Sequence, residues 1–150
     1  LGVMVAKADV MAWPPGAHAS TFGGNPVSCA AAIATIELLR TSLVKNAAEV
    51  GDHLQQGLRA LMDKHAIIGD VRGKGLMVGV ELVRDRATKE RATTERNAVV
   101  NEAFTRGMLI LGAGQNAVRF SPPLVLSKAQ ADTAIRLFDE SLTAVTTRGK

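Results

Sequence analysis

The sequence is poor in several residue types, and each scarcity narrows the class of protein. Cys29 is the one cysteine among 150 residues, so no disulfide forms within the chain, which fits a reducing cytoplasm. Four Phe, one Trp and no Tyr leave few side chains on which nucleic-acid bases stack. No uninterrupted apolar run reaches the roughly 18 residues that a membrane-spanning helix needs.

Charge of one sign is also not concentrated anywhere. The formal net charge is +4, yet segments such as "LVRDRATKERATTER" mix both signs, whereas a nucleic-acid footprint needs clustered positive charge. With 47% apolar and 21% charged residues, the composition is that of a globular protein. We therefore expect no nucleic-acid partner, no membrane and no metal site.

The first residues also lack features of a natural start. The chain opens "LGVMVAKADVMAW", without Met and without a signal-peptide n-region. The apolar run at residues 2–6 is typical of an interior strand. We therefore expect this sequence to be a fragment of a longer protein.

Two helices are predicted next. The first, over about Pro26 to Arg40, is apolar nearly all round and should be buried on most sides. The second runs from about Leu43 or Asn46 to Lys64. Its apolar residues recur at spacings of three and four, and its polar face should lie in water. The apolar set is Val50, Leu54, Leu58, Leu61 and Met62, and the polar set is Gln55, Gln56 and Arg59.

The remainder alternates strands and helices. Residues 68–83, "IGDVRGKGLMVGVELV", predict two strands around a glycine turn. A helix follows over 92–106, with Val99, Val100, Ala103 and Phe104 on its apolar face. Short strands are expected at 108–111 and 117–120. Ser127 and Gln130 form a capping box for the last helix, whose inner face is Ile135, Phe138, Leu142 and Val145. A domain boundary is expected near residues 40–46.

The stretch "HASTFGGNPVSCAAA" has the features of an anion-binding turn. Two glycines relax the backbone, Asn25 is a suitable helix cap, and Pro26 suits the first helical turn. Free backbone N–H groups at such a junction are how proteins hold phosphates. A tight turn with an ordinary helix cap is the alternative that these residues alone leave open.

Three motifs together resemble a known family. "HASTFGGNPVSCAAA", "GDVRGKGLMVGVEL" and "VRFSPPLVLS", in this order and at these separations, look like the C-terminal part of class III aminotransferases. These are the pyridoxal-phosphate enzymes that include 4-aminobutyrate, ornithine and acetylornithine transaminases. The resemblance covers essentially the whole chain.

The resemblance implies a fold class and a division into domains. The fold class is α/β, as the C-terminal portion of a fold-type I pyridoxal-phosphate transferase that ends in a small α+β domain. Residues 1–42 would be the end of the large cofactor-binding domain: a strand, a phosphate-contacting loop and a linking helix. Residues 43–150 would be the small domain.

The resemblance also implies site residues. By analogy with relatives, Thr21 gives its hydroxyl and backbone N–H to the phosphate of pyridoxal 5'-phosphate, and Phe22 lies with it at the cofactor. Thr21 would do so across a homodimer interface, in the neighbouring subunit's site. Arg119 would lie at the active-site mouth and pair with the substrate's carboxylate or with a gating Glu, a task that suits a permanently charged guanidinium.

One part of the family pattern is missing. The Schiff-base lysine lies in relatives shortly before the segment that starts this sequence, and none of the lysines present, including Lys7 and Lys74, matches its position. We therefore expect no catalytic residue in this chain, with that lysine upstream, and expect the chain to be inactive alone.

The function that the resemblance implies is amino-group transfer in the cytoplasm by the parent enzyme. An ω-amino acid, either 4-aminobutyrate-like or ornithine or acetylornithine, would donate to 2-oxoglutarate. One alternative is an amino-acid racemase or aminomutase of the same family, although aminomutases tend to carry a serine where Gly23 stands. A non-catalytic interaction module is the other alternative, if the native chain begins near Leu1.

Overall fold

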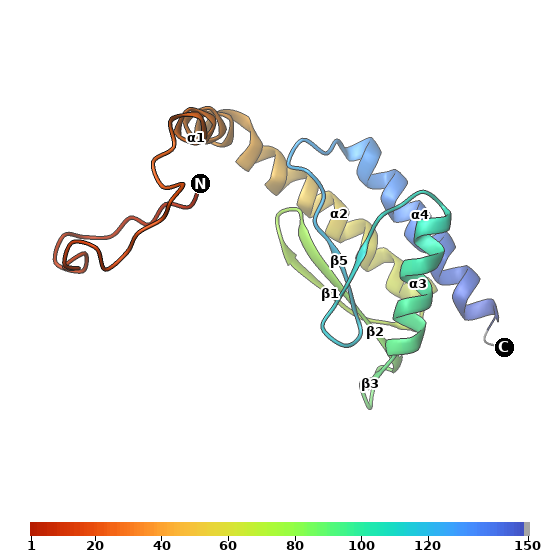
Figure 1. The fold of residues 1–150 in the computed structure, drawn as a ribbon. Helices are drawn as coiled ribbons and strands as arrows, with labels where there is room; N and C mark the ends of the chain where they lie inside the picture. Colours follow the sequence, from red (N-terminus) through yellow and green to blue (C-terminus); the bar gives the residue numbers. More distant parts are fainter. Residues whose placement is uncertain (149–150) are drawn as a thin grey trace. The chain divides into compact units, whose positions relative to one another are not determined.

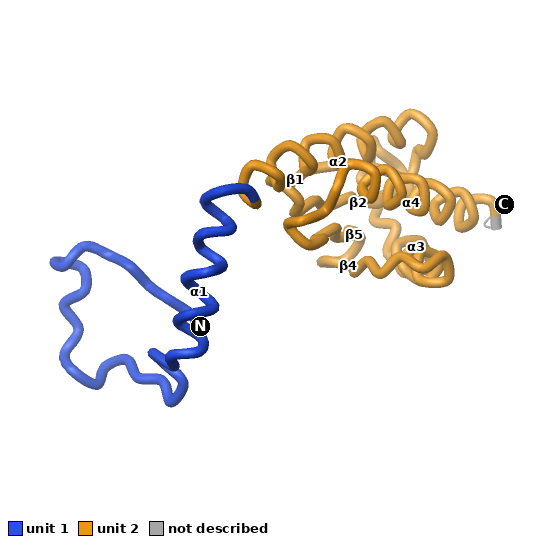
Figure 2. The backbone as a smooth tube through the Cα atoms, turned by 90° about the horizontal axis from the view of Figure 1, so that it is seen from above, with its two compact units in different colours: residues 1–42 blue, residues 43–150 orange. Residues whose placement is uncertain are grey.

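The computed structural model describes residues 1–148, and the chain divides into two compact units (Figure 2). The first comprises Leu1–Ser42 and the second Leu43–Lys150.

The first unit is turns and one helix. Residues 1–25 contain turns but no strand, so the predicted strand at 2–6 is wrong for this structure, and Val3 and Val5 are 75% and 88% exposed. The physical reason is that an extended segment becomes a strand only by pairing, and residues 1–42 offer no other strand to pair with.

Helix α1, Pro26–Leu38, is also not buried as predicted. None of its residues is buried, and Val27 and Ile33 are 78% and 70% exposed, because no other element of residues 1–42 packs on it. The helical stretch Pro26–Lys64 is long and apolar enough, with a window of mean hydropathy 1.5, to cross a membrane. The count of uninterrupted apolar residues did not anticipate this, although core helices of soluble proteins pass the same test.

A five-residue π-helix, η1 (Leu39–Leu43), separates α1 from α2 (Val44–Lys64). Two hydroxyls there donate to carbonyls four residues earlier, Thr41 to Glu37 at 2.8 Å and Ser42 to Leu38 at 3.3 Å. Such local hydroxyl bonds compete with the regular helical pattern. The change from the first predicted helix to the second therefore coincides with a change in helix type.

The second unit is an antiparallel sheet with helices on one face (Figure 1). The strand order is β1–β2–β5–β4, and a fifth strand, β3, pairs with β2. The strands are β1 Ile68–Lys74, β2 Met77–Asp85, β3 Glu90–Arg91, β4 Leu111–Ala113 and β5 Ala117–Phe120. The predicted strand at 108–111 begins instead at Leu111, although Met108 and Ile110 are buried.

The core lies between this sheet and helices α2, α3 (Thr93–Thr105) and α4 (Lys128–Arg148). Phe120 of β5 meets Phe138 of α4 edge to face, with ring centroids 5.2 Å apart. The inward side chains are mostly β-branched or leucine, as a sheet covered on one face requires. They include Val50, Leu54, Leu58, Ile68, Val71, Val78, Val80, Val99, Val118 and Leu142.

The predicted capping box at the start of α4 is confirmed. The backbone N–H of Gln130 donates to the Ser127 hydroxyl at 3.2 Å, and the Ser127 N–H donates to the Gln130 side chain at 2.9 Å.

Two side-chain predictions are wrong. Gln55 is buried and accepts a hydrogen bond from Arg59, while Phe104 is 66% exposed because it lies on the helix side away from the sheet.

Candidate cofactor and carboxylate sites

The turn before α1 is closed by backbone hydrogen bonds and is open at one glycine. The Gly23 N–H donates to the Ser20 carbonyl and the Asn25 N–H to the Phe22 carbonyl, each at 3.2 Å. Gly24 has φ +71°, a left-handed conformation that side chains disfavour, and a Cβ added there would meet nothing within 4 Å. The backbone is therefore approachable at this point.

The helix start itself offers fewer N–H groups than expected. The Asn25 side chain accepts from the Ser28 N–H at 3.1 Å, its carbonyl accepts from the Cys29 N–H at 2.9 Å, and Pro26 has no N–H. Of the first four helical positions, Val27 keeps an N–H without a partner in the described residues. The Asn25 cap therefore occupies the N–H groups of Ser28 and Cys29, which were expected to be free to bind a phosphate.

Thr21 and Phe22 precede this cap. Within residues 1–148 neither the Thr21 hydroxyl nor its backbone N–H has a hydrogen-bond partner, and Phe22 is 81% exposed. A hydroxyl, free backbone N–H groups and an open glycine suit one side of a phosphate. The residues present therefore fit a contribution to phosphate binding, with no cation of their own in the turn.

Arg119 lies on β5 between Val118 and Phe120, which are 0% and 5% exposed and face the core. Alternation along the strand puts Arg119 on the other face, where it is exposed. Its partners in register are Gly79 of β2 and Leu111 of β4. It has no ion-pair or hydrogen-bond partner among the described side chains, so its guanidinium is available to a carboxylate.

Arg72, on the same sheet face, is not available in this way. Its Nη1 donates to Asp70 at 2.6 Å and to Glu81 at 2.8 Å. The hydrogen bond from Arg72 outweighs desolvation and holds the pKa of Glu81 below its usual value. Gly79 separates the two arginines in register, so this face carries one neutralised guanidinium and one free guanidinium.

The loop after Arg119 is fixed to α2. Asn46 donates from Nδ2 to the carbonyls of Leu124 at 2.7 Å and of Leu126 at 3.0 Å, and Pro122 and Pro123 stiffen the segment. A largely apolar hollow of about 270 Å³ lies between this loop, α2, β5 and α4. The "SPPL" segment therefore holds a defined conformation next to Arg119.

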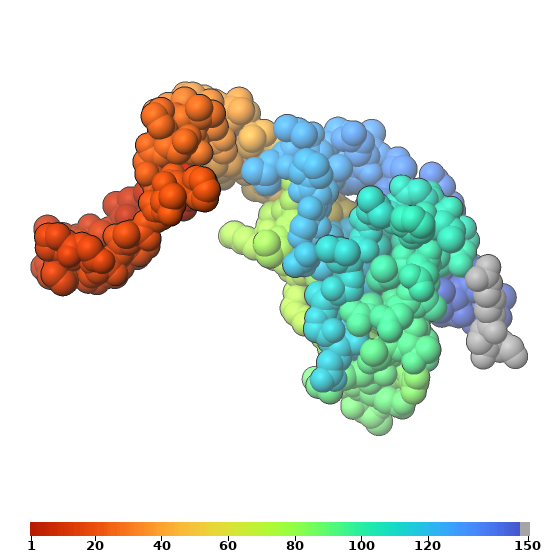
Figure 3. Space-filling view, in the orientation of Figure 1, coloured from red at the N-terminus to blue at the C-terminus, as the bar shows by residue number. Residues whose placement is uncertain are grey.

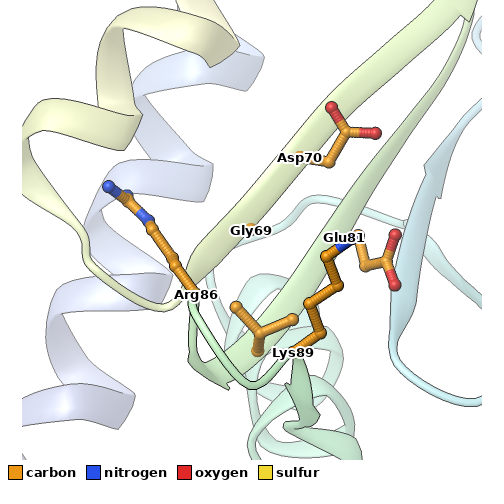
Figure 4. A pocket seen from close by; sticks show the side chains of 6 residues that line it. Gly69, Asp70, Glu81, Arg86 and Lys89 are labelled. Atoms are coloured by element: carbon orange, nitrogen blue, oxygen red, sulfur yellow. The ribbon is translucent and has the colours of Figure 1, made fainter.

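A second hollow, of about 300 Å³, has charged walls (Figure 4). Asp70 and Glu81 lie on one side, while Arg86 points away from both carboxylates. The Arg86 guanidinium donates to the carbonyls of Met62, His65 and Ile68 at 2.6, 3.0 and 2.9 Å. It therefore closes the C-terminal end of α2, where a cation is favourable.

Sequence reasoning missed two residues that hold the β4–β5 hairpin. Asn116 is buried, and its Nδ2 donates to the Leu82 carbonyl at 2.7 Å. Arg96 of α3 is also buried and donates to the Ala117 carbonyl at 3.2 Å. The signal for Arg96 was its position three and seven residues before Val99 and Ala103, on the apolar helix face.

These features define an α+β domain whose sheet carries, within the described residues, one arginine without an ion-pair or hydrogen-bond partner, and a separate cap-and-turn unit that fits a phosphate. The chain belongs to the class III aminotransferase family, because the model of that family matches residues 1–142. The resemblance expected from the three motifs is confirmed. Enzymes of this family depend on pyridoxal phosphate.

Individual relatives differ in reaction. The chain is 36% identical over 146 residues to the acetylornithine aminotransferase of Caldanaerobacter subterraneus subsp. tengcongensis, covering 97% of this chain and 35% of that protein. It is 38% identical to the leucine/methionine racemase of Thermococcus litoralis, covering 97% and 33%. It is 43% identical to the taurine–pyruvate aminotransferase of Bilophila wadsworthia, covering 84% and 29%.

Solved structures agree on the fold. A Bacillus anthracis aminotransferase matches with a TM-score of 0.80 at 33% identity, covering 85% of this chain and 30% of that one. The Pseudomonas jessenii omega transaminase in complex with PMP matches with a TM-score of 0.80 at 32% identity, covering 87% and 29%. The expected fold class is confirmed. The chain spans about a third of the length of its relatives.

Proposed function

We propose that this chain is the C-terminal third of a pyridoxal-phosphate-dependent aminotransferase. The observation that carries the proposal is the match to acetylornithine aminotransferase over 97% of the chain, together with the family model over residues 1–142. Residues 1–42 belong in this proposal to the end of the large cofactor domain and residues 43–150 to the small domain. The enzyme acts in the cytoplasm.

In the proposed enzyme, pyridoxal phosphate supplies the electron-withdrawing ring on which an amino group is carried between substrates. The part of the protein in this chain binds and orients. Thr21 donates its hydroxyl and N–H to the phosphate, Phe22 borders it, and Arg119 holds a substrate carboxylate. The lysine that moves the proton lies in the part that precedes Leu1, so residues 1–150 expressed alone have no transaminase activity.

The Thr21 assignment is tested by cofactor affinity rather than by rate. Thr21→Ala in the full-length enzyme removes a donor that has no other partner in the described residues, so the dissociation constant for pyridoxal phosphate should rise about tenfold. Thr35→Ala is the matched control, because that hydroxyl already donates to the Ala31 carbonyl at 2.8 Å. Equal affinities for the two variants would contradict the assignment.

The homodimer is tested by mixing Thr21→Ala with a variant that lacks the catalytic lysine, at a pyridoxal phosphate concentration that loads the wild type but is too low to load Thr21→Ala, so that neither variant is active alone. If Thr21 completes the neighbouring subunit's site, a Thr21→Ala subunit paired with a subunit lacking the catalytic lysine contains one complete site. Activity should then return on mixing. If Thr21 serves its own subunit, the hybrid has no complete site and stays inactive.

The proposed amino donor is an ω-amino acid, 4-aminobutyrate-like or ornithine or acetylornithine, and the acceptor is 2-oxoglutarate. Support comes from acetylornithine aminotransferases at 36 to 39% identity. A panel of these donors, each tested with 2-oxoglutarate and with pyruvate, separates this substrate set from that of the taurine–pyruvate relative. Transfer to pyruvate alone would overturn the proposed acceptor.

An amino-acid racemase is the second candidate, because two relatives carry that type of name. They are the leucine/methionine racemase at 38% identity and the isoleucine 2-epimerase of Lentilactobacillus buchneri at 37%. Incubation of the full-length enzyme with L-leucine and no oxo acid distinguishes the two. Formation of D-leucine supports racemisation, whereas a strict need for an oxo acid supports transamination.

A further inference from the structure

Arg96 is a buried cation without a carboxylate. It lies on α3 and is 9% exposed, its Nε has no hydrogen-bond partner, and no ion pair reaches it within the described residues. Burying a guanidinium in this way is unfavourable unless it is paired, and an apolar residue of similar length would pack the same space more favourably. Its contacts with the hairpin must therefore account for a charged side chain at this position.

The contacts of Arg96 are with the β4–β5 hairpin. Its Nη1 donates to the Ala117 carbonyl at 3.2 Å, at the first residue of β5. Its guanidinium also lies against Gly112 of β4, where an added Cβ would come within 2.1 Å of Nη1. Gly112 thus leaves the space that the guanidinium occupies. Figure 3 shows the hairpin in cyan beside the green α3.

These two contacts are adjacent to Arg119 in the sheet. Ala117 lies two residues before Arg119 on the same strand, and side chains two apart share a face. Gly112 follows Leu111, which is the partner of Arg119 in register. A shift of the hairpin at either contact therefore moves the strand segment that carries the Arg119 side chain.

We propose that Arg96 is a positioning residue, which fixes the β4–β5 hairpin so that Arg119 meets the substrate carboxylate. This inference rests on the proposed role of Arg119. Arg96 does not touch the substrate; it acts from the core side of the sheet, while Arg119 acts from the opposite side. The contacts with the Ala117 carbonyl and with Gly112 require the guanidinium to lie inside the domain, and this accounts for the unfavourable buried charge.

The test uses the full-length, cofactor-loaded enzyme and the variant Arg96→Met. We expect the KM for amino donor and oxo acid to rise roughly three- to tenfold with kcat within about twofold, as weaker ground-state binding requires. The Tm should be equal to or above that of the wild type, since an unpaired buried charge is removed. A lower Tm with unchanged KM would show a merely structural role and overturn the proposal.

A second readout does not depend on turnover. Glutarate carries two carboxylates but no amino or oxo group, so its dissociation constant, measured by calorimetry, reports carboxylate binding alone. Arg96→Met and Gly112→Ala should both weaken glutarate binding by the same factor as the KM change. Arg91→Ala is the matched control, because Arg91 reaches the same hairpin at Gln115 but is exposed.

The double variant separates this inference from the proposed function. If Arg96 acts through Arg119, Arg96→Met adds no further rise in KM to Arg119→Ala, whereas independent effects multiply. An unchanged KM in Arg119→Ala alone would refute the role of Arg119 itself. A raised KM in Arg119→Ala with independent effects of Arg96→Met would refute only the positioning role.

Discussion

Two glycines of α2 differ in what surrounds them, and this difference predicts a large loss of stability for one glycine-to-alanine substitution and a small change for the other. A Cβ at Gly51 would lie 2.2 Å from the carbonyl carbon and oxygen of Gly75, which itself has φ +54°. A Cβ at Gly57 would meet the terminal Cδ1 of Ile135 at 2.3 Å. The first neighbour is backbone and cannot move away without displacing the β1–β2 turn. The second is the end of a flexible side chain.

Gly51→Ala should therefore lower the free energy of unfolding by about 2–4 kcal/mol. It should do so even though alanine favours a helix over glycine by about 1 kcal/mol. Gly57→Ala is the control and should stay within about 1 kcal/mol of wild type. Urea unfolding of both variants measures the difference. Equal stabilities would mean that the turn yields to Gly51→Ala as easily as Ile135 yields to Gly57→Ala.

Asp139 of α4 ties α2 to α4 through two bonds. His65 Nε2 lies 2.5 Å from one carboxylate oxygen, and Lys64 Nζ donates to the other at 2.6 Å. Burial acts to raise the pKa of Asp139, but the hydrogen bonds from His65 and Lys64 outweigh it and hold this pKa below the ordinary 3.8. A carboxyl with a lowered pKa stabilises the fold above its unfolded-state pKa and loses that effect as pH falls through the folded-state pKa.

Asp139→Asn should thus lower the free energy of unfolding by about 1–3 kcal/mol at neutral pH. Because the wild type loses the same stabilisation when Asp139 is protonated, the difference between the two proteins should shrink as pH falls below 3.8. Urea midpoints of both proteins measured from pH 6 downward give this difference directly. A gap that stays constant with pH would exclude the carboxylate as its source.

Residue-level prediction succeeded where periodicity alone decides burial. Val50, Leu54 and Leu58 repeat at four-residue spacing and are buried. It failed for Arg96, because a charged residue on the apolar face of a helix is normally predicted to be exposed. Arg96 is buried because Gly112 opposite it leaves space for the guanidinium. Thr21 and Arg119 were proposed as site residues through the resemblance to relatives, since the residues of this chain by themselves indicate no more than a turn and a strand arginine.

Elements of the second unit could be predicted because their signals are local. The glycine turn of β1–β2, the helix after it and the capping box of α4 are each encoded within a few residues. The predictions for residues 2–6 and α1 were less successful. An apolar run indicates that the segment is buried in the folded protein, but it does not indicate which other surface covers it. For these residues the partner surface does not lie within residues 1–42.

The capping box gives a prediction at the scale of one helix. Ser127→Ala removes the acceptor for the Gln130 N–H and should lower the free energy of unfolding by about 1 kcal/mol. Ser127→Asp keeps an acceptor for this N–H and should retain most of the stability that Ser127→Ala loses. Thr133→Ala is the control, because that hydroxyl donates to the Ala129 carbonyl inside the helix and caps nothing. Thermal unfolding followed by circular dichroism compares the three.

At the scale of the whole molecule, the exposed apolar side chains are unevenly distributed. In the first unit, eleven large apolar residues are each more than half exposed. So much exposed apolar surface is typical of interaction surfaces. The set is Leu1, Val3, Met4, Val5, Val10, Trp13, Phe22, Val27, Ile33, Ile36 and Leu38. These residues require a cover that the first unit does not contain.

Removal of that unit should therefore change the association state. Residues 43–150 alone should be monomeric by light scattering at concentrations where residues 1–150 form larger species. The reason is that the second unit keeps its own core of buried residues, whereas the first presents the apolar set. Identical masses for both chains would show that this set does not drive association.

The guanidinium of Arg86 has a consequence for the order in which the second unit forms. Its acceptors, the carbonyls of Met62, His65 and Ile68, belong to the end of α2 and the start of β1, 18 to 24 residues earlier in the chain. The hydrogen bonds from Arg86 to those carbonyls form only once the end of β2 is present, whereas the His65 carbonyl also accepts from the nearby Ile68 N–H at 3.1 Å. On a ribosome, the corner between α2 and β1 therefore emerges well before the residue that completes it. The hydrogen bonds from Arg86 to this corner then form at the same stage as the pairing of β2 with β1.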